Sequence, residues 1–167
     1  MGQMMSKDYK KVILDKLTRE LKEQHFKKKG NLFSFSNGDL TYFIGVQSSQ
    51  SSTASILKLT VNTEIASVSI SKLDDTSLPI EHQRHYNRRI GFYLDDKQDK
   101  WWTVESIDSA IKAANEIAEI IGEKVIPNFE TIRSTSDLVT LWRNGGWLGI
   151  TEGQRKHYLS LLENFEK

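Results

Sequence analysis

Cysteine is absent from the 167-residue sequence, and proline occurs only twice. Without cysteine the chain has no disulfide framework, no thiolate zinc site and no cysteine nucleophile. No hydrophobic run approaches the roughly 18 residues that a membrane span requires, and the N-terminal residues lack the apolar stretch of a secretory signal. We therefore expect a cytoplasmic protein that does not enter a membrane.

The sequence also has no marked excess of either charge sign, since it contains 23 basic and 22 acidic residues. With 38% hydrophobic and 27% charged residues, the composition is typical of a folded protein. The length predicts a single domain over residues 1–167, with residues 1–6 as a disordered tail. Residues 1–30 hold 9 basic and 4 acidic residues, which we interpret as a solvated helix face. Nucleic acid is not expected as a partner, since its binders show a larger basic excess.

The first periodic segment predicts a helix over residues 7–24, with Ser6 as its N-cap. Its apolar residues recur at every fourth position and form one stripe: Tyr9, Ile13, Leu17 and Leu21. Residues 27–30, three lysines and a glycine, are predicted to end this helix, because cations and glycine both suit a helix C-terminus.

The pattern then changes to strand periodicity around a predicted turn at Asn37 and Gly38. With those two residues in the turn, Phe35 lies opposite Leu40 and Phe33 lies opposite Tyr42. Alternate residues then share one apolar face: Phe33, Phe35, Leu40, Tyr42, Ile44 and Val46.

Two further strands are predicted downstream. Residues 57–65 alternate between apolar and polar, which indicates an antiparallel strand with one wet face, and a bulge or strand end is expected near Ala66. Residues 72–79 are interpreted as a loop and residues 89–94 as a fourth strand. Residues 95–100 form a polar turn before Trp101 and Trp102, whose indoles point to opposite faces of an extended segment.

The remaining chain is predicted to be helical. A helix over residues 107–126 is capped by Ser106, and Pro127 kinks or ends it. Its predicted buried stripe consists of Ile107, Ile111, Ala114, Ala118 and Ile121. A short helix over 134–142 stops at two glycines, and a capping box at residues 151–154 opens the last helix. The fold class is α+β: an antiparallel β-sheet meander with an N-terminal helix and C-terminal helices packed mainly on one face.

The sequence contains no nucleophile elbow, phosphate loop or dinucleotide-binding motif. We therefore assign no catalytic residue and no cofactor. His82 and His85 are three residues apart, a spacing that on a helix brings both imidazoles to one face where they can share a metal. The surroundings supply only scattered carboxylates, so we favour two exposed loop histidines and predict no metal site.

Three arginines, Arg84, Arg88 and Arg89, lie close to His85. Guanidinium groups bind phosphate and carboxylate in a bidentate way, so this cluster is a candidate anion pocket. The favoured interpretation is instead that the arginines pair with the acidic residues at 95, 96 and 99 across a strand and turn.

One aromatic ring, Phe43, stands on the otherwise polar face of the predicted sheet, with Gln47 and Asn62 near it. An exposed ring of this kind is costly unless something covers it. Residues 66–80 can cover it, and the alternative is that Phe43 and one of Trp101 and Trp102 form an aromatic anchor for a partner. The sequence leaves both alternatives open.

Several segments together resemble the bacterial domain-of-unknown-function family 4304 over about residues 7–130. The strongest marks are the Gln47-Ser48-Ser49 strand end, Asn62, the Arg89-Ile90-Gly91 step and the pair Trp101-Trp102. His25-Phe26 stands where Gly-Phe is expected after the first helix. The resemblance implies a small bacterial cytoplasmic α+β protein and supplies no catalytic residue or cofactor.

The leading hypothesis is a non-catalytic module that binds another protein through its sheet face and the Arg/Trp region. In one version it is an immunity-type protein that neutralises a toxin. The alternative is a small enzyme or an anion-binding domain that uses Arg84, His85, Arg88 and Arg89. The candidate binding residues are Phe43, Gln47, Asn62, Arg84, His85, Arg88, Arg89, Trp101 and Trp102. The identity of the partner and the oligomeric state are not indicated.

Overall fold

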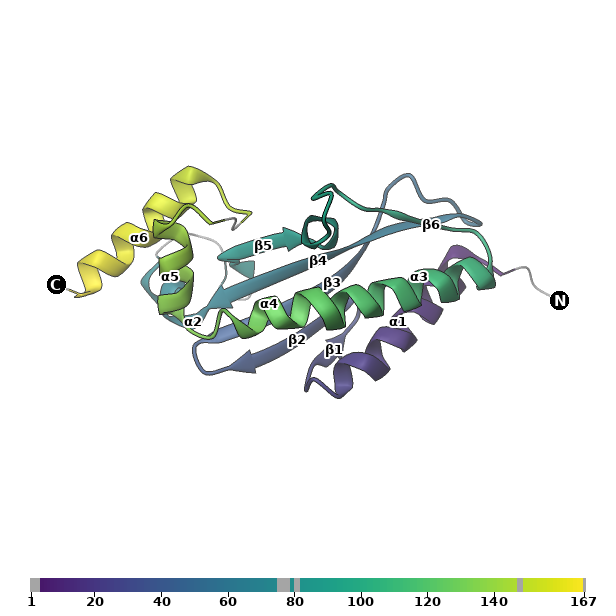
Figure 1. Cartoon of the computed structure of the whole chain (residues 1–167), viewed down its shortest axis with the longest axis horizontal. Helices are drawn as coiled ribbons and strands as arrows, with labels where there is room; N and C mark the ends of the chain where they lie inside the picture. Colours follow the sequence, from purple (N-terminus) through teal and green to yellow (C-terminus); the bar gives the residue numbers. More distant parts are fainter. Residues whose placement is uncertain (1–3, 75–78, 80–81, 147–148, 167) are drawn as a thin grey trace.

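The computed structural model of the chain describes residues 4–74, 79, 82–146 and 149–166. One antiparallel sheet is combined with helices at both ends of the sequence, which confirms the α+β class (Figure 1). The strands are β1 (Lys27–Lys29), β2 (Leu32–Asn37), β3 (Leu40–Ser48), β4 (Leu57–Ser67), β5 (Tyr86–Arg89) and β6 (Trp102–Val104). Among the described residues, no helix is both long enough and apolar enough to cross a bilayer.

The helices fall into two groups (Figure 1). On one side of the sheet lie α1 (Ser6–Lys22), α3 (Ile107–Ile120), the π turn η3 (Ile121–Val125) and α4 (Ile126–Glu130). At one end of the sheet gather α2 (Val68–Leu73), α5 (Thr135–Arg143) and α6 (Glu152–Glu166). A short 3-10 turn, η2 (Ile90–Tyr93), follows β5.

The sheet is a meander in which β1, β2, β3 and β4 pair in chain order. The far edge of β4 carries two strands placed end to end. Residues Asn62–Ile65 pair with β5, and residues Leu57–Leu59 pair with β6. Because both run antiparallel to β4, β5 and β6 act as one strand that residues 90–101 interrupt.

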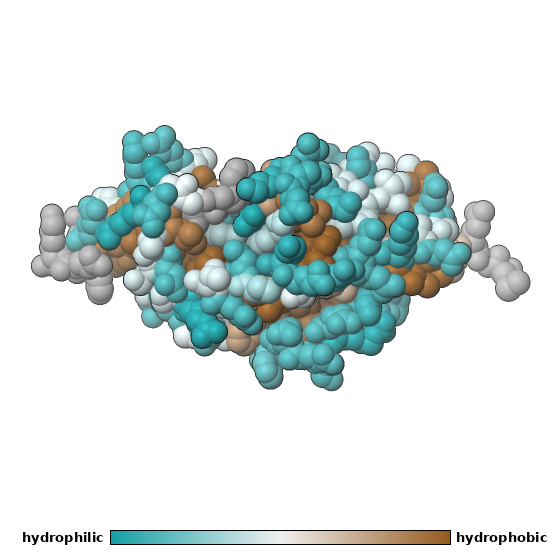
Figure 2. All heavy atoms as spheres, viewed as in Figure 1, coloured by the Kyte–Doolittle hydropathy of each residue, from teal (hydrophilic) through white to brown (hydrophobic). Residues whose placement is uncertain are grey.

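The core lies between the sheet and the α1/α3 layer. All four residues of the predicted α1 stripe are buried: Tyr9, Ile13, Leu17 and Leu21. Along β3 and β4 the residues on the helix side are buried, whereas most on the other side are half-buried or exposed, as predicted for a sheet with one wet face. On the helix side of the molecule, hydrophobic residues show as separate patches between hydrophilic ones (Figure 2).

The start and end of the first helix differ from the prediction. Ser6 is the first helical residue and Met5 precedes it as the N-cap, with Asp8 accepting a hydrogen bond from the Met5 amide at 2.7 Å. The Ser6 amide donates to the Ala54 carbonyl at 2.8 Å, so the prediction of a disordered tail is wrong for residues 4–6, and residues 1–3 lie outside the described part. The three lysines do not end the helix, which stops at Lys22; they form edge strand β1.

The β2–β3 turn lies one residue later than predicted. Asn37 pairs with Leu40, so Gly38 and Asp39 form the turn, and Phe35 lies opposite Tyr42 rather than Leu40. Gly38 has a φ of +63°, a conformation that costs other residues energy. The register therefore differs by two residues, and a shift of two returns every side chain to the same face. The predicted apolar face is correct for this reason.

The carboxylate of Asp39 explains the position of this turn. It accepts hydrogen bonds from the Ser69 amide at 3.0 Å and from the Thr135 hydroxyl. Hydrogen bonds from Ser69 and Thr135 hold the pKa of Asp39 below its usual value, although partial burial alone would raise it. The turn, the start of α2 and the start of α5 are thus joined at one side chain.

In the region after β4 one prediction is confirmed and two need correction. The strand ends at Ser67, as expected near Ala66, and the Ser67 hydroxyl accepts from the Ile70 amide to cap α2. Part of the predicted 72–79 loop is helical, since α2 continues to Leu73, and residues 75–78 lie outside the described residues. The predicted fourth strand at 89–94 is wrong: the strand is β5, and residues 90–93 form the η2 turn.

The C-terminal helices begin as predicted, but the buried face of α3 follows the predicted stripe only in part. Ser106 caps α3 by accepting from the Ser109 amide at 3.0 Å. Ala114 and Ile121 of the predicted stripe are buried, Ile107 and Ala118 are partly buried, and Ile111 is 46% exposed. Ala110, Ala113 and Ile117 complete the buried face. Small alanines let α3 approach its neighbours closely, so packing outweighs the larger hydrophobicity of isoleucine.

Pro127 neither ends nor sharply kinks the helical run. The turn before it widens, with the Ile126 amide donating to the Ile121 carbonyl five residues back, and the helix continues to Glu130. Proline collides with the carbonyl four residues earlier in a straight α-helix, and a wider turn relieves that contact. The predicted capping box is present, with Thr151 and Gln154 exchanging hydrogen bonds, and Ser134 caps α5.

Candidate functional site

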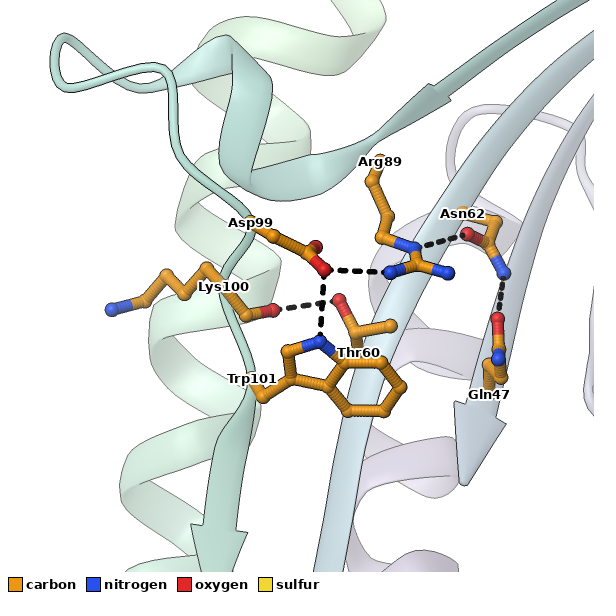
Figure 3. A network of polar contacts seen from close by, with 7 residues as sticks. All are labelled: Gln47, Thr60, Asn62, Arg89, Asp99, Lys100 and Trp101. Atoms are coloured by element: carbon orange, nitrogen blue, oxygen red, sulfur yellow. Dashed lines mark hydrogen bonds and ion pairs between the residues drawn. The ribbon is translucent and has the colours of Figure 1, made fainter. Parts of the chain in front are cut away.

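The break between β5 and β6 organises the side chains on the helix-free face of the sheet. Thr60 lies on this face opposite the break, and its hydroxyl donates to the Lys100 carbonyl at 2.7 Å (Figure 3). Thr60 is fully buried although it occupies a position predicted to be wet. The returning chain at residues 99–101 covers it, so the wet-face prediction is wrong at this residue.

A chain of polar contacts crosses this break (Figure 3). The side-chain amide of Asn62 on β4 donates from Nδ2 to Gln47 Oε1 on β3 at 2.7 Å. Its oxygen, Oδ1, accepts from Arg89 Nε on β5 at 3.3 Å. Arg89 Nη1 lies 2.6 Å from Asp99 Oδ2, and the Trp101 indole donates to the same oxygen at 3.0 Å. These contacts link three neighbouring strands to the segment that leads into β6.

Cations lie against the ring of Trp101. The Arg89 guanidinium carbon is 5.3 Å from the ring centroid, and Lys58 Nζ is 5.8 Å from it. The indole is only half-buried. Trp101 is thus held in one orientation by Asp99 and by cation–π contacts while part of its surface stays open to solvent.

A second aromatic–cation pair lies on the same face. The Arg84 guanidinium stacks on the Phe43 ring at 3.7 Å from its centroid, and Arg84 Nε lies 3.5 Å from Glu64 Oε2. Burial raises the pKa of Glu64, and the charge of Arg84 opposes that rise. Ala66, Val68 and Ser71 line a hollow of about 130 Å³ beside the ring. Phe43 is half-buried, so among the described residues Arg84 and the start of α2 shield it in part.

Three of the candidate residues do not join these contacts: Arg88 and Trp102 point to the helix side, and His85 packs against Tyr158 of α6. His85 is fully buried, and its Nδ1 accepts from the Ser67 amide at 2.8 Å. The Arg88 guanidinium lies over the Tyr93 ring and donates to the Phe92 carbonyl at 2.6 Å. The Trp102 indole donates to Glu116 on α3 at 2.7 Å. The two adjacent tryptophans therefore lie on opposite faces, as predicted.

The arginine cluster is consequently divided between the two faces. Arg84 and Arg89 lie on the helix-free face, Arg88 lies on the other, and His85 is buried against Tyr158 of α6, so the four side chains do not line one cavity. The favoured pairing of arginines with the acidic turn is confirmed for Arg89 with Asp99, whereas Arg84 pairs with Glu64. The prediction of two exposed loop histidines is correct for His82 and wrong for His85, which is fully buried. Within the described ranges no three potential metal ligands gather in one place.

Two carboxylates hold the arginines of this face: Asp99, which sequence reasoning named as a partner, and Glu64, which it did not. The short distance in sequence between Arg89 and the acidic turn at residues 95–99 indicated the pair with Asp99. No local pattern indicates that Glu64 contacts Arg84. A hollow of about 290 Å³ beside Arg89 and Asp99 also involves Asn87, Phe92 and Gly149, which are far from β3 in the sequence.

A glycine fixes the geometry of the break. A Cβ on Gly91 would lie 2.1 Å from the Gln98 carbonyl oxygen and 2.6 Å from the Lys100 amide nitrogen. The η2 turn therefore rests directly on the backbone of residues 98–100, which places Asp99 beside Arg89. Close backbone approach is the physical reason that an Arg-Ile-Gly step precedes the Asp-Lys-Trp-Trp segment.

The family model of a domain of unknown function, DUF4304, matches residues 17–131. The chain belongs to the DUF4304 family. All residues of the polar chain, from Gln47 to Trp101, lie within the DUF4304 region, as do Phe43 and Arg84. No curated protein and no solved structure matches the chain. The resemblance expected from the sequence is confirmed, and the family description assigns no activity.

Substitution of Gly91 tests whether the break is held by close packing. Gly91→Ala should lower the free energy of unfolding by about 1–3 kcal/mol, because the added methyl group overlaps backbone atoms that cannot move independently. Urea denaturation measures the loss. Gly122→Ala is the matched control, since Gly122 is helical with nothing within 4 Å of its Cβ position, and this change should be neutral or stabilising. Equal stability of the Gly91→Ala variant and the native chain would contradict the packing at the break.

Titration of His85 should make stability depend on pH. Burial lowers the pKa of His85 to about 4, with Asp74 opposing the shift, whereas the unfolded value is about 6.5. Between these values the unfolded chain binds more protons, so stability is retained above about pH 6.5 and falls as the pH drops toward 4. The expected loss attributable to His85 between pH 7.5 and pH 5 is about 2 kcal/mol.

Urea denaturation at these two pH values measures this loss. His85→Asn keeps an acceptor near the Ser67 amide and does not titrate, so its stability should change less between the two values than that of the native chain. The exposed His82 supplies the control, and His82→Asn should retain the native pH dependence. An unchanged pH dependence in His85→Asn would show that His85 is not the group responsible.

Proposed function

We propose that the chain is a non-catalytic module that binds another protein on the helix-free face of its sheet. The observation that carries the proposal is the pairing of two partly open aromatic rings with arginines on this one face. Phe43 lies with Arg84, and Trp101 lies with Arg89. Aromatic residues and arginine are enriched in protein interfaces, and Trp and Arg are among the residues that contribute most to binding energy.

The position of Phe43 and Arg89 on paired strands, with Arg84 just before β5 and Trp101 just before β6, supports this function. β3 and β4 pair along Leu40–Ser48, and β5 extends the same surface. Side chains on such strands lose little conformational freedom on binding, because the sheet and the polar chain from Gln47 to Asp99 already orient them.

The chemical character of the face also fits a protein partner better than a small anion. Both of its arginines are paired with carboxylates, Arg84 with Glu64 and Arg89 with Asp99. The hollows beside Phe43 and beside Arg89 have volumes of about 130 and 290 Å³. A mixed surface of aromatic anchors and satisfied charges resembles the centre and rim of an interface.

In one specific form of this proposal, the partner is a bacterial toxin and the chain is its immunity-type protein. An immunity protein acts by occupying its toxin, so binding chemistry alone is sufficient. The host would then be a bacterium and the complex would form in its cytoplasm.

Site-specific photo-crosslinking in cells of the source organism tests the binding face. A photoreactive phenylalanine analogue is placed at Gln47 or Thr103, which are exposed on the helix-free face, and at Ile111 or Glu119, which are exposed on α3. The proposal predicts one protein crosslinked from the first pair of positions and not from the second. Crosslinking of that protein only from α3 would overturn the proposed face.

The captured protein then allows two quantitative checks. Phe43→Ser should weaken its binding by at least about 1 kcal/mol while leaving the melting temperature nearly unchanged, because the ring is only half-buried. A large fall in melting temperature would instead place Phe43 in the core. The immunity form further predicts that the captured protein arrests growth when expressed alone and that co-expression of the chain restores growth.

A further inference from the structure

A separate hollow of about 250 Å³ lies on the helix side of the sheet, between the β2–β3 hairpin and α4. Four aromatic rings line it: Phe26, Phe35, Tyr42 and Phe129. Pockets for drug-sized ligands usually measure about 300–1,000 Å³. A hollow slightly smaller than this range suits a molecule with one or two rings.

The aromatic walls are fixed before any ligand binds. Successive ring centroids are 5.7 Å apart for Phe26 and Phe35, 6.0 Å for Phe35 and Tyr42, and 5.1 Å for Tyr42 and Phe129. The Tyr42 hydroxyl donates to the Ile132 carbonyl at 2.5 Å. Preformed walls reduce the entropy that a ligand must lose on binding.

The π turn between α3 and α4 determines the orientation of Phe129, the last of the four rings. Ile121, Val125 and Phe129 are all buried at intervals of four residues. In a continuous α-helix, positions four apart drift around the axis because a turn contains 3.6 residues. The wider turn offsets this drift, so Phe129 still faces the sheet and Glu130 borders the hollow. Such interruptions of α-helices are frequent at functional sites.

The rim of the hollow carries one charge of each sign. Glu130 and Arg133 both line it and both are exposed. Arg133 Nε donates to the Glu130 backbone carbonyl at 3.0 Å. Within the described part of the chain, no ion pair is formed by the Glu130 carboxylate or by the terminal guanidinium nitrogens of Arg133. Both groups are therefore open to a ligand.

We propose that this hollow binds a free aromatic amino acid, with its ring packed against the sides of Phe35, Tyr42 and Phe129 that line the hollow. Its carboxylate would pair with Arg133 and its ammonium group with Glu130. A ligand with only a negative charge is repelled by Glu130, and one with only a positive charge is repelled by Arg133. A zwitterion with an aromatic ring satisfies the rim and the walls together. This site is independent of the helix-free face.

Isothermal titration calorimetry with L-phenylalanine at pH 7 tests the proposal. The size of the ligand predicts a Kd between about 10 µM and 1 mM. Three matched compounds separate the contributions of the carboxylate, the ammonium group and the ring to the binding affinity. Phenethylamine lacks the carboxylate, 3-phenylpropionate lacks the ammonium group, and L-leucine lacks the ring. Each should bind at least about tenfold more weakly than L-phenylalanine.

Substitutions at the rim locate the binding. Arg133→Gln and Glu130→Gln should each weaken L-phenylalanine binding about tenfold, and Glu130→Gln should also narrow the gap between L-phenylalanine and 3-phenylpropionate. Arg19→Gln and Glu119→Gln, which change exposed residues outside the hollow, should leave the Kd unchanged. No heat with L-phenylalanine, binding of all four compounds with equal affinity, or binding unaffected by the rim variants would each overturn the proposal.

Discussion

Strand β4 is longer than either strand on its far edge, and this mismatch determines the rest of the helix-free face. β5 covers Asn62–Ile65 and β6 covers Leu57–Leu59. The chain must therefore leave the sheet and return to it at Thr60. The excursion can be compact only because Gly91 lets the η2 turn rest on the backbone of residues 98–100. The same contact delivers Asp99 and Trp101 to Arg89.

The resulting contacts position side chains more than they stabilise the fold. Arg89 and Asp99 are each about a third exposed, and ion pairs near solvent are worth at most about 1 kcal/mol. Their effect is geometric, since Asp99 holds both the guanidinium and the Trp101 indole. The helix-free face and the aromatic hollow lie on opposite sides of the sheet, so two binding events can take place without competing for the same residues.

Local patterns predicted the elements, and long-range contacts decided their details. The α1 stripe and the alternation in β3 and β4 follow from periodicity, which survives a register shift of two residues. No local signal shows that Asp39 reaches α2 and α5, that η2 interrupts the edge strand, or that alanines rather than Ile111 face the core. The candidate site was predicted in part, since Gln47, Asn62, Arg89 and Trp101 converge. Arg88 points away because neighbouring residues of β5 alternate between faces, and His85 precedes β5 and is buried against Tyr158 of α6.

The central claim is that the helix-free face, which includes Trp101, is the interaction surface. The most direct measurement is the NMR signal of the Trp101 indole N–H in the ¹⁵N-labelled chain, assigned with Trp101→Phe, during titration with the captured protein. The indole donates to Asp99 on this face, whereas that of Trp102 donates to Glu116 on α3. We predict a large shift of the Trp101 signal and a small one for Trp102. An unchanged Trp101 signal together with shifts confined to α1 and α3 would contradict the account.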